Sequence, residues 1–241
     1  MKKKAHKTRR QQLAEKTAIA KERVDAANAL SDPLNPSLRS YKAPDGSQIN
    51  VECSRVRDLR PETLVWIFDL MERNMKVMYE QTRWGWNAQR KQKELTEPAA
   101  WYLVASDADD KLIGFSHFRF DVDYGVEVLY CYELQIEPTA RRKGLGRFMM
   151  AALESMALEN LMQKVVLTVF KRNFTAVPFF HILGYTFHYF PFTKFQLFYV
   201  FVFDPGTPRI FLTLRMLCTY FPSQKGDAAR VFLNFPYLKF F

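Results

Sequence analysis

The chain has 241 residues and a formal net charge of +10, from 35 Lys and Arg against 25 Asp and Glu. Its length predicts one domain, with or without tails, and a composition that is 48% apolar and 15% aromatic excludes wholesale disorder. No apolar run reaches the roughly 18 residues of a membrane-spanning helix, and the Lys-rich start leads into no apolar signal core. Cys53, Cys131 and Cys218 lack metal-ligand spacing, so we expect no bound metal and a reducing location, in the nucleus and cytoplasm.

The charge is concentrated at the two ends of the chain. Residues 1–24 hold nine Lys/Arg and two Glu, a net of +7, and residues 187–241 hold six Lys/Arg and two Asp, a net of +4. The part between them carries a net charge of −1, which argues against a general nucleic-acid-binding fold. The basic start is interpreted either as a solvated tail or as a segment that makes weak contact with nucleic acid or chromatin.

Regular apolar patterns begin after a basic arm, a helical stretch and a Pro-containing linker. Residues 49–53 alternate as a strand does, and 61–80 place apolar side chains at the i, i+3 and i+4 spacing of an amphipathic helix. Residues 79–86 follow neither period. The other predicted elements are strands over 101–105, 112–120, 126–136 and 165–170, and helices over 144–160 and 176–183.

This order of elements predicts an α+β fold (three-layer α/β), with a mixed central sheet flanked by helices. We expect a basic N-terminal arm over 1–45, a folded domain over 46–187 and a divergent, aromatic-rich segment over 188–241. Strands at 195–203 and 210–217 are expected in that last segment. The protein is expected to be a monomer.

A glycine-containing turn between a predicted strand and a predicted helix is the most informative motif. Gly144 and Gly146 let backbone N–H groups approach an anion, and the N-terminus of the following helix adds a favourable dipole. Arg142, Lys143 and Arg147 add positive charge around the turn. This combination predicts a pyrophosphate-binding site.

This turn resembles the acetyl-coenzyme A site of the GCN5-related N-acetyltransferase (GNAT) family. The stretch that runs from Asn173 through Ala176 and Phe179-Phe180 to Gly184-Tyr185 is similar to the segment that follows in that family. The resemblance covers about 50–187 and implies the GNAT acyl-CoA N-acyltransferase fold, with acetyl-CoA as co-substrate. It implies that the coenzyme is held by Leu134, Gln135, Ile136, Arg142, Lys143, Gly144, Leu145, Gly146, Arg147 and Asn173.

Three aromatic-rich strings, at 78–86, 115–121 and 129–133, are similar to those of N-alpha-acetyltransferases of the NatD type. This resemblance implies transfer of acetyl to the N-terminal α-amine of histone 4 and histone 2A tails, which begin Ser-Gly-Arg-Gly. A GNAT enzyme that acetylates lysine side chains or a small amine would use the same coenzyme turn. A non-catalytic chromatin-binding module is a further alternative.

Acetyl transfer to an amine needs a positioned thioester, a proton acceptor and a donor for the carbonyl oxygen. We assign the base to Glu133, because a carboxylate among tyrosines and apolar groups is partly desolvated and its pKa rises. Tyr132 is assigned to orient the amine or protonate the leaving thiolate, and Tyr130 to shape the peptide slot. Strict alternation puts both tyrosines on one side of the strand and Glu133 on the other, unless a β-bulge intervenes, as the resemblance implies.

Two carboxylates at the end of a predicted strand are candidates for binding the arginine of such a tail. Asp121 and Asp123 are two residues apart and therefore point to the same side, although a solvated strand end is the simpler alternative. The resemblance implies that Tyr79 and Trp84 form walls of the amine pocket. It also implies that Thr168, in the strand beside the coenzyme, offers a hydroxyl to the peptide, and that Tyr132 contacts the substrate as well.

Overall fold

A computed structural model describes residues 7–188 and 198–203. The strands in these ranges are β1 (Ser40–Lys42), β2 (Gln48–Arg55), β3 (Trp101–Ser106), β4 (Leu112–Asp123), β5 (Val126–Ile136), β6 (Lys164–Phe170), β7 (Thr186–His188) and β8 (Phe198–Phe203). The α-helices are α1 (Arg9–Ala29), α2 (Pro61–Glu80), α3 (Ala88–Leu95), α4 (Leu145–Glu159) and α5 (Ala176–Ile182). None of these helices combines the length and apolar content that crossing a membrane requires.

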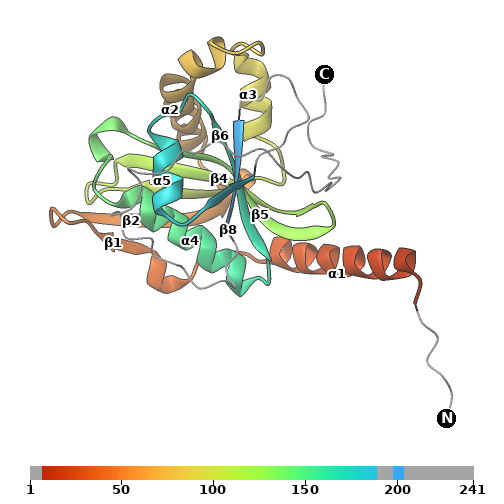
Figure 1. Ribbon diagram of the computed structural model, residues 1–241. Helices are drawn as coiled ribbons and strands as arrows, with labels where there is room; N and C mark the ends of the chain where they lie inside the picture. Colours follow the sequence, from red (N-terminus) through yellow and green to blue (C-terminus); the bar gives the residue numbers. More distant parts are fainter. Residues whose placement is uncertain (1–6, 189–197, 204–241) are drawn as a thin grey trace, which may run out of the picture.

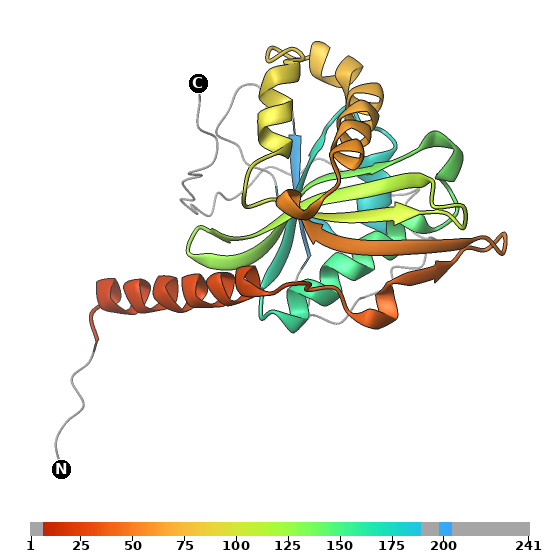
Figure 2. The ribbon, with the colours of Figure 1, turned by 180° about the vertical axis from the view of Figure 1, so that it is seen from behind.

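The described strands form one eight-stranded mixed sheet in the order β1-β2-β3-β4-β5-β6-β8-β7. Among the described strands only the pair β5 and β6 is parallel, and α4 makes the crossover between them, as parallel strands require. Helices α2 and α3 cover one face of the sheet, and α4 and α5 cover the other (Figures 1 and 2). The predicted α+β fold with a mixed sheet flanked by helices is confirmed.

The sheet separates two apolar cores, and strand β3 contributes side chains to both. Successive side chains of a strand point to opposite faces. Trp101 and Leu103 pack in the core beneath α4, whereas Tyr102 and Val104 pack in the core beneath α2. All four are buried, so β3 is a central strand that supports both layers.

Three of the described elements are absent from the pattern-based prediction: β1, α3 and the three-residue strand β7. Strand β1 lies in the expected linker and has three residues, too few to show an alternation. Helix α3 is almost wholly polar and buries only Lys91 and Leu95, so no apolar stripe marks it. The expected strand over 210–217 lies outside the described residues, as does most of 188–241.

Helix α1 is tied to the sheet by the part of the helix nearest its C-terminus. Ala20, Val24 and Ala27 are its buried residues, and the Asn28 side chain donates to the Phe120 carbonyl at 3.1 Å. The earlier turns of the helix extend past the body of the protein (Figures 1 and 2). The helix begins in a capping box, in which Thr8 and Gln11 satisfy each other's backbone N–H groups.

Candidate active site

An opening between β5 and β6 is the central feature of the site. The parallel pairing of these strands begins at Val128 opposite Lys164 and ends at Cys131 opposite Leu167. Beyond that point β6 continues to pair with β8, up to Phe170, and β5 continues to pair with β4, up to Ile136. The strands therefore separate where β5 carries residues 132–136, and that edge of β5 is left to bind something else.

Backbone polar groups of β5 point into this opening. The Glu137 N–H donates to the Ile113 carbonyl of the neighbouring β4 at 2.8 Å. Because antiparallel residues alternate between bonding to one neighbour and facing the other side, the amides of Leu134 and Ile136 face away from β4. The Ile136 carbonyl accordingly accepts from Arg141 at 3.0 Å and from Asn74 at 3.4 Å. An extended ligand arm that pairs with Leu134 fits this edge.

The turn that follows β5 has two residues in the left-handed region. Arg142 has φ 64° and Gly144, which caps α4, has φ 84°. Among the described residues, no side chain caps the first turn of α4, so its backbone N–H groups are available to an anion, as they are in anion sites at helix N-termini. This geometry fits a pyrophosphate.

The two glycines of the turn also have packing roles that the sequence did not reveal. A Cβ atom on Gly144 would lie 2.2 Å from the Tyr41 hydroxyl oxygen. On Gly146 it would lie 3.2 Å from the Phe179 ring and 3.3 Å from the end of the Ile136 side chain. Gly144 thus admits a tyrosine of β1, and Gly146 lets α4 approach α5 and β5 closely.

The cations around the turn are not equivalent. Lys143 is paired with Asp45 of the β1–β2 hairpin at 2.9 Å, and Arg141 donates to the Asn74 side chain at 2.8 Å. Arg142 and Arg147 are exposed and have no ion pair within the described ranges. These two arginines are therefore the cations available to a bound pyrophosphate.

A register shift in β4 and β5 brings the predicted catalytic residues together. His117 pairs with Glu133, but the next residue, Phe118, pairs with Cys131. Tyr132 is thus the extra residue of a β-bulge, and the predicted bulge is confirmed. The rings of Tyr130 and Tyr132 lie 4.7 Å apart, on the strand segment that also carries Glu133.

The Glu133 carboxylate is buried, with 8% of the residue exposed. One oxygen accepts from Lys91 Nζ at 3.3 Å, and the other accepts from Gln135 Nε2 at 3.0 Å. Burial raises the pKa of Glu133, in the direction expected, and the charge of Lys91 opposes this rise. The site therefore holds one oriented carboxyl group with an elevated pKa beside the opening.

Tyr79 contacts the same cluster. The Tyr79 hydroxyl accepts from Lys91 Nζ at 3.0 Å, and its ring packs edge-to-face on Phe170, 4.9 Å away. Trp84 lies in the connection from α2 to α3 and is 49% exposed. Trp86 packs on Tyr79, with ring centroids 5.6 Å apart, a contact that the sequence pattern did not predict.

The predicted substrate residues of β4 and β6 affect the pKa values of the two tyrosines. Burial raises the pKa of Tyr130, the Thr168 side chain opposes this rise, and Tyr132 and then Asp123 add smaller increases. Asp121 acts in the same direction on Tyr132, whose pKa rises to about 12, chiefly through burial. Asp123 itself has a raised pKa, because of burial and then Asp121.

Asn173 follows β6, as the resemblance implied, but its side chain is engaged locally. The side-chain oxygen Oδ1 of Asn173 accepts from the Ala176 N–H at 3.0 Å, so this side chain fixes the start of α5.

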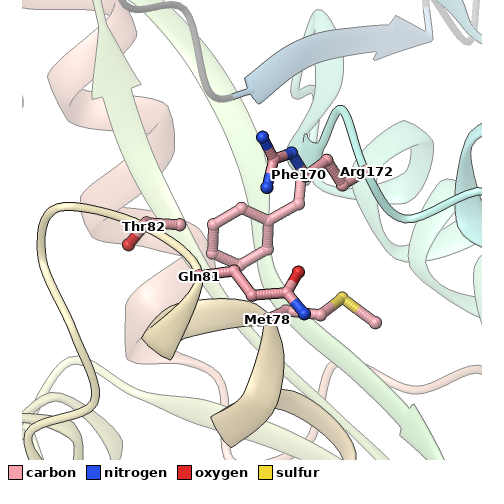
Figure 3. A pocket seen from close by; sticks show the side chains of 5 residues that line it. All are labelled: Met78, Gln81, Thr82, Phe170 and Arg172. Carbon is pink, nitrogen blue, oxygen red and sulfur yellow. The ribbon is translucent and has the colours of Figure 1, made fainter.

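A small pocket lies where the end of α2 meets the end of β6 (Figure 3). Phe170 forms one wall and belongs to the part of β6 that has left β5. The pocket adjoins Tyr79 through the ring contact described above. Its lining is formed by Met78, Gln81, Thr82, Phe170 and Arg172.

Sequence reasoning missed three residues of this site. Lys91 is 42 positions from Glu133, and Tyr41 is 102 positions from Lys143, so no local pattern connects either pair. Asp45 reads as an ordinary turn residue before Gly46. The one available signal was Asn87, whose side chain accepts from the Arg90 N–H at 2.8 Å and marks the start of α3.

A separated β5–β6 pair, a helix-capping glycine turn and an oriented carboxyl group define a GNAT-type acyl-CoA N-acyltransferase fold. The chain belongs to the acetyltransferase (GNAT) family, whose model matches residues 63–185. The class of reaction is therefore acetyl transfer with acetyl-CoA as donor.

One solved structure supports the fold, and two others are similar to a lower degree. The GNAT domain of S. lividans PAT is 11% identical, with a TM-score of 0.54 over 70% of this chain and 98% of that one. A PaiA N-acetyltransferase of Thermoplasma acidophilum in complex with coenzyme A is 14% identical (TM-score 0.48; 64% and 99% covered). NAA60 of Arabidopsis thaliana in complex with a bisubstrate analogue is 13% identical (TM-score 0.48; 64% and 99% covered).

Proposed function

We propose that this chain transfers acetyl from acetyl-CoA to the N-terminal α-amine of proteins, with histone 4 and histone 2A tails that begin Ser-Gly-Arg-Gly as acceptors. The observation that carries the proposal is the position of Asp121 and Asp123. Arg119 of β4 pairs with Tyr130 of β5, so Asp121 and Asp123, two and four positions after Arg119, lie on the same face of the sheet as Tyr130. An arginine near the start of a tail would meet them while the amine reaches Glu133.

The charge of the surroundings supports a cationic acceptor. The part of the chain between the basic ends has a net charge of −1, and the free arginines of the site, Arg142 and Arg147, lie at the coenzyme turn. The positive side chains of the site thus serve to bind the acetyl donor, and the negative side chains serve to bind the acceptor. A tail rich in Lys and Arg matches this arrangement.

The residues can carry out the transfer in a balanced sequence of steps. Glu133 accepts one proton from the incoming α-ammonium group through a water molecule, and the neutral amine nitrogen then attacks the thioester carbonyl carbon. The C–S bond breaks as the C–N bond is completed, and the leaving thiolate takes a proton from the Tyr132 hydroxyl. The second proton of the former ammonium group leaves the new amide nitrogen and restores the Tyr132 hydroxyl. Because the pKa of Tyr132 is raised to about 12 by burial, its hydroxyl still carries that proton at neutral pH.

The remaining parts of the proposal concern where and with what the enzyme acts. We infer a monomer that is present in the nucleus and cytoplasm. The basic residues of α1 and the segment before it would add a weak contact with nucleic acid or chromatin.

A set of four acceptors tests the proposal. A free Ser-Gly-Arg-Gly peptide that also contains lysine, the same peptide with a blocked N-terminus, a Ser-Gly-Ala-Gly version and spermidine are each incubated with acetyl-CoA. Mass spectrometry then locates the acetyl group. We expect modification at the α-amine of the free arginine peptide and at least tenfold lower kcat/KM for the alanine version, the loss of one charge-assisted contact.

Each alternative has its own outcome in this experiment. Acetylation of the blocked peptide would indicate a lysine acetyltransferase, and acetylation of spermidine alone would indicate a small-amine enzyme. Binding of coenzyme without transfer to any acceptor would favour a non-catalytic module. In a second step, Asp121→Asn with Asp123→Asn should abolish the preference for arginine, whereas Asp109→Asn, at an exposed turn, should retain it.

A further inference from the structure

A lysine is buried beside the proposed base. Lys91 lies on α3 and is 6% exposed, although lysine is almost never buried without partners. Its ammonium group has three protons to donate. These are directed to Glu94 at 2.9 Å, the Tyr79 hydroxyl at 3.0 Å and Glu133 at 3.3 Å.

This arrangement fixes the Glu133 side chain from two elements at once. Lys91 of α3 donates to one carboxylate oxygen, and Gln135 of the same strand donates to the other. Two hydrogen bonds to different oxygens define both the position and the rotation of a carboxylate. Glu133 therefore has one orientation, and α3 determines it.

The charges of the cluster work in opposite directions on Glu133. Burial raises the pKa of Glu133, Lys91 lowers it and Glu94 raises it. The pKa of Lys91 is itself raised, because the attraction of Glu133, Tyr79 and Glu94 outweighs the effect of burial. Lys91 is therefore an ammonium ion throughout the neutral range.

We propose that Lys91 is a positioning residue for acetyl transfer, which holds the Glu133 carboxylate toward the amine and opposes its protonation. This inference rests on the proposed function, in which Glu133 is the base. A base must be ionised before it can accept a proton, and without Lys91 the buried carboxyl group would bind a proton at higher pH.

Several other titratable groups surround Glu133, and each must be considered in a measurement of pH dependence. His117 is neutral because burial lowers its pKa to about 3, and the pKa of Tyr102 is raised by burial and then by Glu133. Neither changes charge near neutral pH. The groups around Glu133 are Lys91 and Glu94 of α3, Tyr79 of α2, Tyr102 of β3, His117 of β4 and Gln135 of β5. Arg119 of β4 donates to the Glu94 carbonyl at 3.3 Å.

The test is the dependence of kcat/KM on pH, measured with the best acceptor from the peptide set. Lys91→Met should move the acidic limb of the profile upward by about one to two pH units, since a nearby opposite charge is removed. Lys91→Arg retains the positive charge, so its acidic limb should lie close to that of the parent protein. Lys93→Met, at an exposed lysine of the same helix, should leave the limb in place.

If Lys91→Met does not fold, a variant that should move the acidic limb in the opposite direction gives an independent test. Glu94→Gln removes a negative charge that raises the Glu133 pKa, so the acidic limb should move downward. A limb that does not move in Glu94→Gln, or that moves upward, would contradict control of Glu133 by this cluster. Thermal unfolding and coenzyme affinity, measured on each variant, establish that the fold is retained.

The Glu133→Gln variant separates failure of this inference from failure of the proposed function. If Glu133→Gln keeps the acidic limb, Glu133 is not the base and the proposed mechanism fails. If Glu133→Gln loses the limb but folded Lys91→Met keeps it unmoved, the base stands and the role of Lys91 is wrong.

Discussion

The Tyr41 hydroxyl donates a hydrogen bond of 2.9 Å to the Lys143 carbonyl, which joins the β1–β2 hairpin to the coenzyme turn. The Tyr41 ring stacks on Phe148 of α4 at 4.8 Å, and Asp45 of the same hairpin pairs with the Lys143 ammonium at 2.9 Å. Three contacts of different kinds therefore hold the turn from outside. A segment that reads as a linker is part of the support of the coenzyme site.

Tyr41→Phe tests this support with a minimal change. The ring and its stacking are kept, but the Lys143 carbonyl loses its donor, so the turn should become less well ordered. We expect coenzyme A affinity to fall about fivefold to tenfold, corresponding to roughly 1 kcal/mol for one hydrogen bond. Isothermal titration calorimetry measures the affinity. An unchanged dissociation constant would show that the hydroxyl does not support the turn.

What the sequence could predict follows from what is local in the chain. The strand, turn and helix around Gly144 have strong periodic patterns. The bulge beside Glu133 was implied by the family resemblance, whereas alternation alone would separate the tyrosines from the carboxylate. By contrast, Lys91 and Tyr41 act on residues far away in the chain. Their contacts depend on how α3 and β1 pack, and neither element has a pattern strong enough to be recognised.

The roles assigned to single residues show the same division. Lys143 was expected to face the pyrophosphate, because a cation in such a turn usually does, but its partner Asp45 comes from another hairpin. Trp84 and Trp86 are two positions apart in a segment without a period, and the sequence pattern did not predict the packing of Tyr79 against Trp86. Charge and residue type indicate a site, but the partner of each side chain is set by tertiary structure.

Gly144→Ala and Gly46→Ala form a matched pair of substitutions. Both glycines are left-handed, at φ +84° and +85°, but a Cβ on Gly46 meets nothing within 4 Å, whereas on Gly144 it meets the Tyr41 hydroxyl at 2.2 Å. Each should lose about 1 kcal/mol of stability through backbone strain. Only Gly144→Ala must also displace Tyr41, and we expect it to weaken coenzyme A binding at least tenfold.

The double variant Gly144→Ala with Tyr41→Phe identifies the cause. Without the hydroxyl oxygen the closest contact disappears, so the double variant should bind coenzyme A no more weakly than Gly144→Ala alone. Calorimetric affinities that fall by the product of the two single effects would contradict this explanation, because independent sites are additive.

The pair formed by Arg23 of α1 and the buried Glu127 of β5 predicts how firmly α1 is anchored. Arg23→Ala leaves the Glu127 carboxylate with the Gln163 amide, at 3.3 Å, as its remaining side-chain partner. Because breaking one side of a buried pair is costly, and because Arg23 is itself partly exposed, we expect a loss of about 2 kcal/mol in urea unfolding. Lys21→Ala, at an exposed position of the same helix, should change stability by less than about 0.5 kcal/mol.

His117 predicts a pH dependence of folding that one substitution can isolate. Its ring is buried between those of Tyr102 and Tyr132, with centroids 5.2 and 5.0 Å away, and neither ring nitrogen has a hydrogen-bond partner in the described part of the chain. Burial, followed by the charges of Arg119 and Lys91, lowers the pKa of His117 from 6.5 to about 3. The folded protein therefore keeps the ring neutral where the unfolded chain would protonate it.

The sign of the effect follows from this difference. Stabilisation by a neutral His117 is complete above the unfolded pKa near 6.5 and is lost progressively as the pH falls toward 3. His117→Phe keeps a ring between the two tyrosines but cannot bind a proton. We expect the unfolding free energy of the parent protein, relative to His117→Phe, to fall by about 2 kcal/mol between pH 7 and pH 5. Urea titrations at each pH measure the difference, and parallel curves would mean that His117 is protonated equally in both states.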